Sequence, residues 1–419
     1  MVEAAFYGDD FTGSTDALLQ FERFGLRSAL LVELPATEAL QGLAARYDVI
    51  GVAGIARSLP PKEQEAELRP ILTALRDLAP RVVQYKICST ADSSPRLGSL
   101  GRALELGREI FGPAVVPVLA AQPELGRYTV FGHHFAAEAG QVYRLDRQPT
   151  MANHPATPMT ESDLRLHLAA QTQLRIGSID LTAYGDLAAR YAGMQAVDVL
   201  VLDALTDADL KTAGVAILAS GKEPLFAMGS GGLSRALASV LGEQRQAPDL
   251  RPPARSAGAV LAVSGSQSPR TADQIAHAVA AGWTSLVLEP GRQGAIGDAA
   301  VAAFDAGARG VVVHTGRGNA RAATELLPTL TAGLADVVRM VAHSTGVRRL
   351  LVAGGDTSGR VLRELGVRAV ELVSPSIGFG PGAALCRAIA PDPELDGLQI
   401  LLKGGQIGPT DLFERLRAG

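Results

Sequence analysis

The stretch Gly8-Asp9-Asp10-Phe11-Thr12-Gly13-Ser14 lies between an apolar segment and an amphipathic one. Residues 3–7 before it have the composition of a short strand, and apolar residues recur at helical spacing over 15–24. A second strand is expected over 29–34. A strand, a helix and another strand form a βαβ unit, which predicts a parallel sheet with a right-handed crossover.

Polar residues stand after further predicted strands of this half. Those strands are expected over residues 48–53, 81–85, 197–202 and 225–228. They lead into Arg57-Ser58, Lys86 with Ser89-Thr90, Asp203 with Thr206, and Ser230. Because ligands bind at the carboxyl ends of the strands in open parallel sheets, we expect these side chains to line one site together with Asp10.

Acids and cations dominate that expected site. Carboxylates accept hydrogen bonds from hydroxyl groups, and the N–H groups at a helix start favour an anion. Arg57 can hold a carboxylate with two parallel hydrogen bonds, and Lys86 can act as a point charge. Ordinary helix capping is the alternative interpretation for Asp10 and Thr12, and solvated surface positions are the alternative for the two cations.

Composition limits the class of protein. The chain has 419 residues, of which 47% are hydrophobic, and its net charge is −4. These values exclude overall disorder and argue against a nucleic-acid-binding protein. Cys88 and Cys386 are the two cysteines, which excludes a disulfide scaffold, and there is no apolar run of 18 residues. We expect a cytoplasmic α/β enzyme.

Two α/β domains with mostly parallel sheets and a cleft between them are expected. Three prolines within the thirteen residues 244–256 mark a linker over 246–256, which separates a domain of residues 1–245 from one of residues 257–419. The first domain contains an irregular insertion at about 117–158, where Pro and Gly interrupt every periodic pattern. For the histidines in or just after it, structural roles are favoured over a metal site; these are His133, His134, His154 and His167.

Glycine-rich loops follow the predicted strands of the second half. The strands are expected over 259–263, 285–288, 310–313, 349–353, 367–372 and 399–402. The loops are 264–268, 354–359, 378–382 and 403–408. Small residues let backbone N–H groups approach phosphate oxygens, and Asp356 adds a carboxylate able to reach Mg²⁺. The loops predict a phosphate-rich ligand, although neither a P-loop nor the dinucleotide-binding spacing is present.

Four motifs together resemble the four-carbon acid sugar kinase family. They are residues 8–16, 263–266, 354–359 and 402–408, in order over nearly the whole chain. The resemblance implies ATP-dependent phosphorylation of a sugar acid such as erythronate, threonate or 3-oxo-tetronate, at a terminal hydroxyl. It also implies that the first domain binds the sugar acid and that the second binds ATP.

The resemblance assigns individual residues. Substrate binding falls on Asp9, Asp10, Thr12, Gly13, Arg57 and Lys86. Nucleotide binding falls on Ser264, Ser266, Gly354, Gly355, Asp356, Thr357, Gly404 and Gly405. Many members read Lys-x-Asp-Ser-Thr-x-Arg-Gly where this chain reads Lys86-Ile87-Cys88-Ser89-Thr90-Ala91-Asp92-Ser93. The acid at position 88 is lost and the following Arg-Gly is missing, with Asp92 or Arg96 as candidates to compensate.

Phosphoryl transfer mainly requires positioning and charge neutralisation. Asp10 and Lys86 are the expected catalytic residues: Lys86, with Arg57, fixes the sugar-acid carboxylate, and Asp10 orients the attacking hydroxyl and accepts its proton. Asp356 is the expected Mg²⁺ ligand. Two alternatives stay open, a non-catalytic sugar-acid sensor of this fold and an NAD-dependent sugar-acid dehydrogenase. No nucleic-acid or membrane partner is expected, and a homodimer is one option for the oligomeric state.

Overall fold

The computed structural model describes residues 2–194, 196–221, 223–246, 258–316, 320–373, 379 and 383–418, without the side chains of 320–325 and 356. The chain divides into two compact units. The first comprises Met1–Ser28 and Leu34–Ala247, and the second comprises Ala29–Glu33 and Pro248–Gly419. The expected linker lies outside the described residues from position 247 onward. The domain limits and the cleft inferred from the sequence stay predictions.

Seven parallel strands form the sheet of the first unit, in the order β3-β1-β4-β11-β5-β10-β9. They are β1 (Ala4–Gly8), β3 (Val49–Ala53), β4 (Val82–Lys86), β5 (Val116–Leu119), β9 (Ile176–Ile179), β10 (Val199–Leu202) and β11 (Leu225–Gly229). Every residue of the four strands from β3 to β11 is buried, as expected of parallel strands covered on both faces. The last residues of these four buried strands therefore lie together at the carboxyl-end edge of the sheet.

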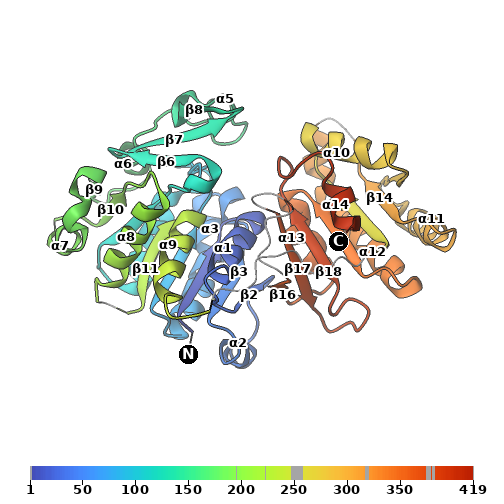
Figure 1. Ribbon diagram of the computed structural model, residues 1–419, viewed down its shortest axis with the longest axis horizontal. Helices are drawn as coiled ribbons and strands as arrows, with labels where there is room; N and C mark the ends of the chain where they lie inside the picture. Colours follow the sequence, from blue (N-terminus) through green and yellow to red (C-terminus); the bar gives the residue numbers. More distant parts are fainter. Residues whose placement is uncertain are drawn as a thin grey trace. The chain divides into compact units, whose positions relative to one another are not determined.

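Helices cover this sheet in two groups (Figure 1). They are α1 (Phe11–Glu22), α2 (Thr37–Ala44), α3 (Pro61–Asp77), α4 (Leu100–Phe111), α7 (Leu187–Gly193), α8 (Asp207–Leu218) and α9 (Gly231–Leu241). Helix α9 packs against both α1 and α8, and α3 packs against α4. The core between helices and sheet includes the stacked rings of Phe6 and Phe21 and those of Tyr7 and Tyr85. Helix α1 begins at Phe11, earlier than its apolar periodicity predicts, because Asp10 caps it.

The stretch 117–158, expected to be irregular, contains a small three-stranded antiparallel sheet after β5. Its strands are β6 (Arg127–Val130), β7 (His133–Glu138) and β8 (Gln141–Arg144). A small apolar core is formed by Ala136 of β7, Leu145, Met151 of the short helix α5 (Pro149–Ala152) and Met159. Helix α6 (Leu164–Ala169) follows, with Asp163 as its cap. Short strands joined by glycine turns conceal the alternation that would reveal them in the sequence.

The strands of the second unit run in the order β13-β14-β12-β15-β18-β17-β16-β2. They are β2 (Ser28–Leu31), β12 (Val260–Ser264), β13 (Thr284–Val287), β14 (Gly310–His314), β15 (Arg349–Ala353), β16 (Ala369–Leu372), β17 (Ala383–Ile389) and β18 (Gln399–Lys403). Strands β13, β14, β12, β15 and β18 pair in parallel, whereas β17 is antiparallel to both β18 and β16. The mostly parallel α/β class inferred from the sequence is confirmed.

The pairing partner of strand β2 is not predicted by the sequence. The sequence predicts a βαβ unit in a parallel sheet without assigning pairs, and in the structure β1 pairs in parallel with β3 and β4. Residues 29–31 of β2 pair antiparallel with β16 of the second unit. Local periodicity identifies a strand but does not determine its partner, which depends on residues more than 300 positions away.

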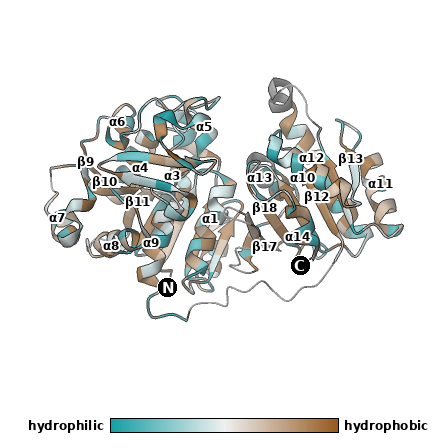
Figure 2. Cartoon of the chain, turned by 45° about the horizontal axis from the view of Figure 1, so that its top comes forward, coloured by the Kyte–Doolittle hydropathy of each residue, from teal (hydrophilic) through white to brown (hydrophobic). Residues whose placement is uncertain are grey.

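The helices of the second unit are α10 (Pro269–Ala280), α11 (Gln293–Asp305), α12 (Ala320–Ser344), α13 (Gly355–Glu364) and α14 (Leu412–Ala418). Helices α11, α12 and α13 pack side by side, and α10 packs against α14. One apolar cluster joins α10 and α14 to strands β12, β15 and β18, of which β12 and β18 are labelled in Figure 2 and coloured as hydrophobic. Among the helices of the described residues, none combines the length and apolar character that a membrane span requires.

Candidate active site

The candidate site of the first unit lies where its central strands end. Gly8 of β1 is in register with Ala53 of β3 and with Lys86 of β4, and Lys86 is in register with Gly229 of β11. The backbone N–H of Asp9 donates to the Lys86 carbonyl at 3.0 Å. The strand ends that the sequence selected therefore meet at one edge of the sheet.

Asp10 begins helix α1 and organises its first turn. Its Oδ1 accepts the Gly13 N–H at 2.9 Å, and its Oδ2 accepts the Thr12 hydroxyl at 3.0 Å. A Cβ on Gly13 would lie 2.3 Å from Asp10 Oδ1 and 3.0 Å from Lys86 Nζ, so only glycine permits this close approach. The capping interpretation and the site interpretation of Asp10 thus describe the same geometry.

Arg57 is bound by both aspartates. Its Nε and Nη2 donate to Asp9 at 3.2 and 2.7 Å, and its Nη1 and Nη2 donate to Asp10 at 3.2 and 3.1 Å. The side chain of Asp9 is 2% exposed and that of Asp10 is 23% exposed. Asp10 is therefore the carboxylate that faces solvent, while Asp9 and Arg57 form its support.

The two aspartates differ in acidity. Burial raises the pKa of Asp9 above its ordinary value, and Arg57 offsets this only in part. Burial acts on Asp10 in the same direction, but Arg57, Lys86 and the Thr12 hydroxyl together outweigh it, so the pKa of Asp10 is lowered. Asp10 is accordingly ionised at neutral pH.

Lys86 is buried, with 2% of its surface exposed. Its Nζ donates to the Ile87 carbonyl at 2.9 Å, and its nearest described carboxylate oxygen, Oδ2 of Asp16, lies 4.0 Å away. Asp16 is itself held by the amide groups of Gln20 and Gln122. Asp16 belongs to the N-terminal motif, but the sequence analysis assigns it no role. Its position one helical turn after Thr12 is the sequence feature that indicates its place beside the site.

The segment after β4 closes the site around Arg57. Thr90 donates to Asp92 at 2.5 Å, and the Cys88 sulfur lies 2.9 Å from the Thr90 hydroxyl. Asp92 Oδ2 lies 3.9 Å from Arg57 Nη1. Burial, reinforced by the charge of Asp92, raises the pKa of Cys88 to about 11, so the thiol is neutral. Of the two residues expected to compensate for the altered segment, Asp92 lies beside Arg57.

Two histidines of other elements form hydrogen bonds with the segment that follows β4. His134 of β7 donates from Nε2 to the Ser89 carbonyl at 2.7 Å, and its Nδ1 lies 2.9 Å from the Thr129 hydroxyl. His167 of α6 contacts the Ser93 hydroxyl at 2.7 Å. Burial lowers the pKa of His134 to about 4, so the ring is neutral. The hydrogen-bonding roles expected for these histidines agree with this geometry, and the described residues include no cluster of three or more metal-ligating side chains.

Three of the glycine-rich loops converge in the second unit. The Gly354 N–H donates to the Lys403 carbonyl at 2.9 Å, which joins the loop after β15 to the loop after β18. A Cβ on Gly405 would lie 2.9 Å from the Ser266 hydroxyl oxygen, so the loop after β12 is equally close. Gly354 has a φ of +118°, a conformation that favours glycine. Helix α13 begins at Gly355, and the side chain of Thr357 in its first turn is buried.

The other predicted nucleotide-binding residues are placed as follows. Ser264 ends β12, and its hydroxyl accepts the Ser266 N–H at 3.3 Å. Gly404 follows the last residue of β18 directly. The side chain of Asp356 and the loop at 378–382, apart from Phe379, lie outside the described residues.

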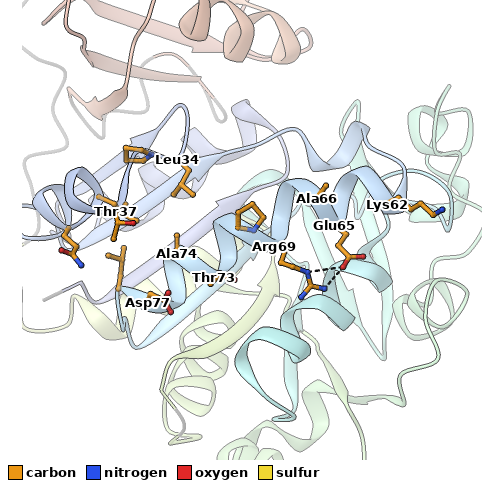
Figure 3. Close-up of a pocket in the computed structure, with 14 residues that line it drawn as sticks. Leu34, Thr37, Lys62, Glu65, Ala66, Arg69, Thr73, Ala74 and Asp77 are labelled. Atoms are coloured by element: carbon orange, nitrogen blue, oxygen red, sulfur yellow. Dashed lines mark hydrogen bonds and ion pairs between the residues drawn. The ribbon is translucent and has the colours of Figure 1, made fainter.

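A separate cavity of about 760 Å³ lies between α2 and α3 of the first unit (Figure 3). Ala66 and Ala74 contribute to its apolar wall, and the ion pair of Glu65 with Arg69 lies at its margin. The residues that line it include none of the predicted site residues.

Comparisons with known proteins match two separate parts of the chain. Residues 4–237 match the family described as "Sugar-binding N-terminal domain", and residues 261–413 match the family described as "Nucleotide-binding C-terminal domain". The chain is thus an α/β protein whose two halves match a sugar-binding and a nucleotide-binding family.

Two relatives carry kinase names. The chain is 39% identical to a 3-oxo-isoapionate kinase from Paraburkholderia graminis, over 99% of this chain and 94% of that protein. It is 31% identical to a 3-oxo-tetronate kinase from Cupriavidus necator, over 97% of this chain and 94% of that protein. The chain belongs to the four-carbon acid sugar kinase family, and it is an ATP-dependent kinase of a small sugar acid. The comparisons lend no support to the sensor or the dehydrogenase.

Solved structures share the fold. A protein from Salmonella typhimurium LT2 has a TM-score of 0.78 at 23% identity, covering 99% of this chain and 98% of its own. A Haemophilus influenzae protein has a TM-score of 0.73 at 22% identity, covering 99% of both chains.

Proposed function

We propose that this kinase phosphorylates a 3-oxo sugar acid at a terminal hydroxyl, and that 3-oxo-isoapionate is a better substrate than 3-oxo-tetronate. The names of both relatives denote 3-oxo acids, and identity is higher to the 3-oxo-isoapionate kinase. The segment from Cys88 to Asp92 supports a substrate different from that of most members, because it has no acid at position 88 and instead places Asp92 3.9 Å from Arg57.

The observation that carries the proposed site is the buried ammonium of Lys86. Among the described residues, its Nζ has one hydrogen-bond acceptor, the Ile87 carbonyl, and no carboxylate closer than 4.0 Å. An ammonium has three donors, and a buried one without close partners is costly. A substrate carboxylate would complete its coordination. Arg57 is better suited to holding Asp9 and Asp10, since its guanidinium already binds both.

Asp10 is the group proposed to orient the attacking hydroxyl. Its ionised carboxylate is partly exposed at the strand ends, and it can accept a hydrogen bond from a sugar hydroxyl. In a loose phosphoryl-transfer transition state the hydroxyl proton leaves late, so a carboxylate of low pKa can still position the nucleophile and receive the proton.

The nucleotide is proposed to bind the converging loops of the second unit. Their backbone N–H groups and the hydroxyls of Ser264, Ser266 and Thr357 are suitable donors to phosphate oxygens. Mg²⁺ usually takes one or two carboxylates together with substrate phosphates, and Asp356, in the first turn of α13, is the proposed ligand. Bound Mg²⁺ would neutralise charge on the transferring phosphoryl group.

The test is an ADP-release assay with 3-oxo-isoapionate, 3-oxo-tetronate, erythronate and threonate. We expect the highest kcat/KM for 3-oxo-isoapionate and at least tenfold lower values for the two acids without an oxo group. Asp10→Asn should reduce kcat by roughly 10²- to 10⁴-fold, the range of lost acid–base assistance. Equal rates on all four acids would contradict the substrate proposal, and near-normal turnover of Asp10→Asn would contradict its assigned role.

A further inference from the structure

Lys403, the last residue of β18, is fully buried in the second unit. Its Nζ donates to the Thr271 hydroxyl at 2.8 Å, and Thr271 donates in turn to the Gly405 carbonyl at 2.8 Å. A direct contact from Nζ to that carbonyl is longer, at 3.5 Å. The relay through Thr271 therefore fixes the turn at Gly405, which the sequence assigns to the nucleotide.

The charge of Lys403 has no described counter-charge. Its neighbours in register, Ala353 of β15 and Ala383 of β17, are apolar. Arg270 on α10 is the described charged group whose field reaches it, and that field is repulsive. On α13 the side chain of Asp356 lies outside the described residues. No other described carboxylate comes within 4.0 Å of Nζ.

The surroundings of Lys403 Nζ add further positive charge. Thr271 lies in the first turn of the twelve-residue helix α10, where the helix dipole is positive. The hydroxyl oxygen of Ser268, the residue before that helix, is buried and has no described partner. Lysine, helix start and Arg270 thus place positive charge beside three glycine-rich loops. A nearby polyanion would balance that charge.

We infer that Lys403 is a positioning residue of the nucleotide site: it sets the Gly405 turn through Thr271, and its ammonium is the internal counter-charge to the nucleotide phosphates. This inference rests on the proposed placement of the nucleotide on these loops. It adds a residue that binds through its neighbours and through its charge.

Protonation provides a distinctive consequence. Burial, assisted by the charge of Arg270, lowers the pKa of Lys403 to about 7. A phosphate brought near favours the charged form and raises that pKa. At pH 8 the free protein holds this lysine mostly neutral, so binding of MgATP takes up a proton, and MgATP affinity falls as the pH rises above 7.

The experiment is calorimetric titration of MgATP into the full-length chain at pH 8, in two buffers of different ionisation enthalpy. Lys403→Met is expected to weaken binding about tenfold or more, as for loss of a charged hydrogen-bonding group, and to abolish the proton uptake. In turnover assays KM for ATP should rise while KM for the sugar acid stays unchanged.

Thr271→Val and Thr271→Ser form the matched pair. The valine keeps the shape and removes the hydroxyl, so MgATP affinity should fall, whereas the serine keeps the relay and should bind within about twofold of the wild type. If Lys403→Met does not fold, this pair decides the question alone.

The outcomes distinguish the role of Lys403 from the placement of the nucleotide on the second unit. Unchanged MgATP affinity and proton uptake in Lys403→Met, or equal binding by the two Thr271 variants, would overturn the inference about Lys403. Failure of the wild-type chain to bind MgATP would instead overturn the placement of the nucleotide. Neither result depends on which sugar acid is the substrate.

Discussion

The two candidate sites solve the problem of buried charge in different ways. In the first unit, Arg57 binds both Asp9 and Asp10 through four hydrogen bonds, and the buried ammonium of Lys86 lies 4.0 Å from the carboxylate of Asp16. In the second, Lys403 is buried among apolar neighbours with hydroxyl and carbonyl partners. A site for a sugar must present fixed acceptors and donors to several hydroxyls. A site for a polyphosphate can keep an unbalanced positive charge, because the ligand brings its own negative charge.

The largest effect is expected for a substitution at Lys86, which tests whether the two sites are chemically separate. Lys86→Met should reduce kcat/KM for the sugar acid by roughly 10²- to 10³-fold, the loss of one partner of a buried charge pair with the substrate carboxylate. MgATP affinity should remain within about twofold, since the ammonium belongs to the first unit. Steady-state kinetics and calorimetry measure the two quantities. Lys62→Met, at an exposed lysine of α3, is the control and should change neither.

Should MgATP affinity fall as much as sugar-acid efficiency, the two sites would not be chemically separate, and the comparison would be wrong.

The next effect concerns stability. Arg57→Lys cannot bind Asp9 and Asp10 with paired donors, so one buried carboxylate loses its compensation. We expect a loss of about 3 kcal/mol in the free energy of unfolding, measured by urea denaturation at pH 7. The matched control is Arg69→Lys, whose ion pairs with Glu65 and Glu109 are exposed, and which should leave the free energy of unfolding nearly unchanged. Equal losses would show that the aspartates do not depend on the guanidinium.

The smallest effect sharpens the role of the histidines. The pKa of His134 is lowered to about 4 in the folded chain, below the unfolded value of about 6.5, so the unfolded state binds more protons between these values. Stability should therefore fall by about 2 kcal/mol between pH 7 and pH 5 because of this residue. His134→Gln keeps a donor to the Ser89 carbonyl but does not titrate. A pH dependence of unfolding identical to that of the wild type would refute this assignment.

Much of the first site follows from the sequence because parallel strands bring their ends to one edge. Asp10, Arg57 and Lys86 stand directly after strands, so the pattern that predicts the strands also groups the residues. The sequence does not show that Arg57 binds two aspartates at once, since that depends on a turn 47 residues away. It also does not show the burial of Lys403, because helix α10 covers it from more than 120 positions earlier.

The fold is predictable to a similar depth. Apolar runs locate most strands, but the partner of β2 and the small sheet of β6, β7 and β8 depend on contacts that local periodicity does not encode. The antiparallel strand β17 also follows a segment that the sequence presented only as a glycine-rich loop.

The excursion of residues 29–33 into the second unit has a practical consequence for dissecting the enzyme. A fragment that starts after the linker would lack β2, and the backbone donors and acceptors of β16 would then form an open edge, the usual nucleus of strand-to-strand aggregation. Expressed alone, the second unit should be poorly soluble, and a synthetic peptide spanning residues 27–34 should rescue it by supplying the missing strand in trans.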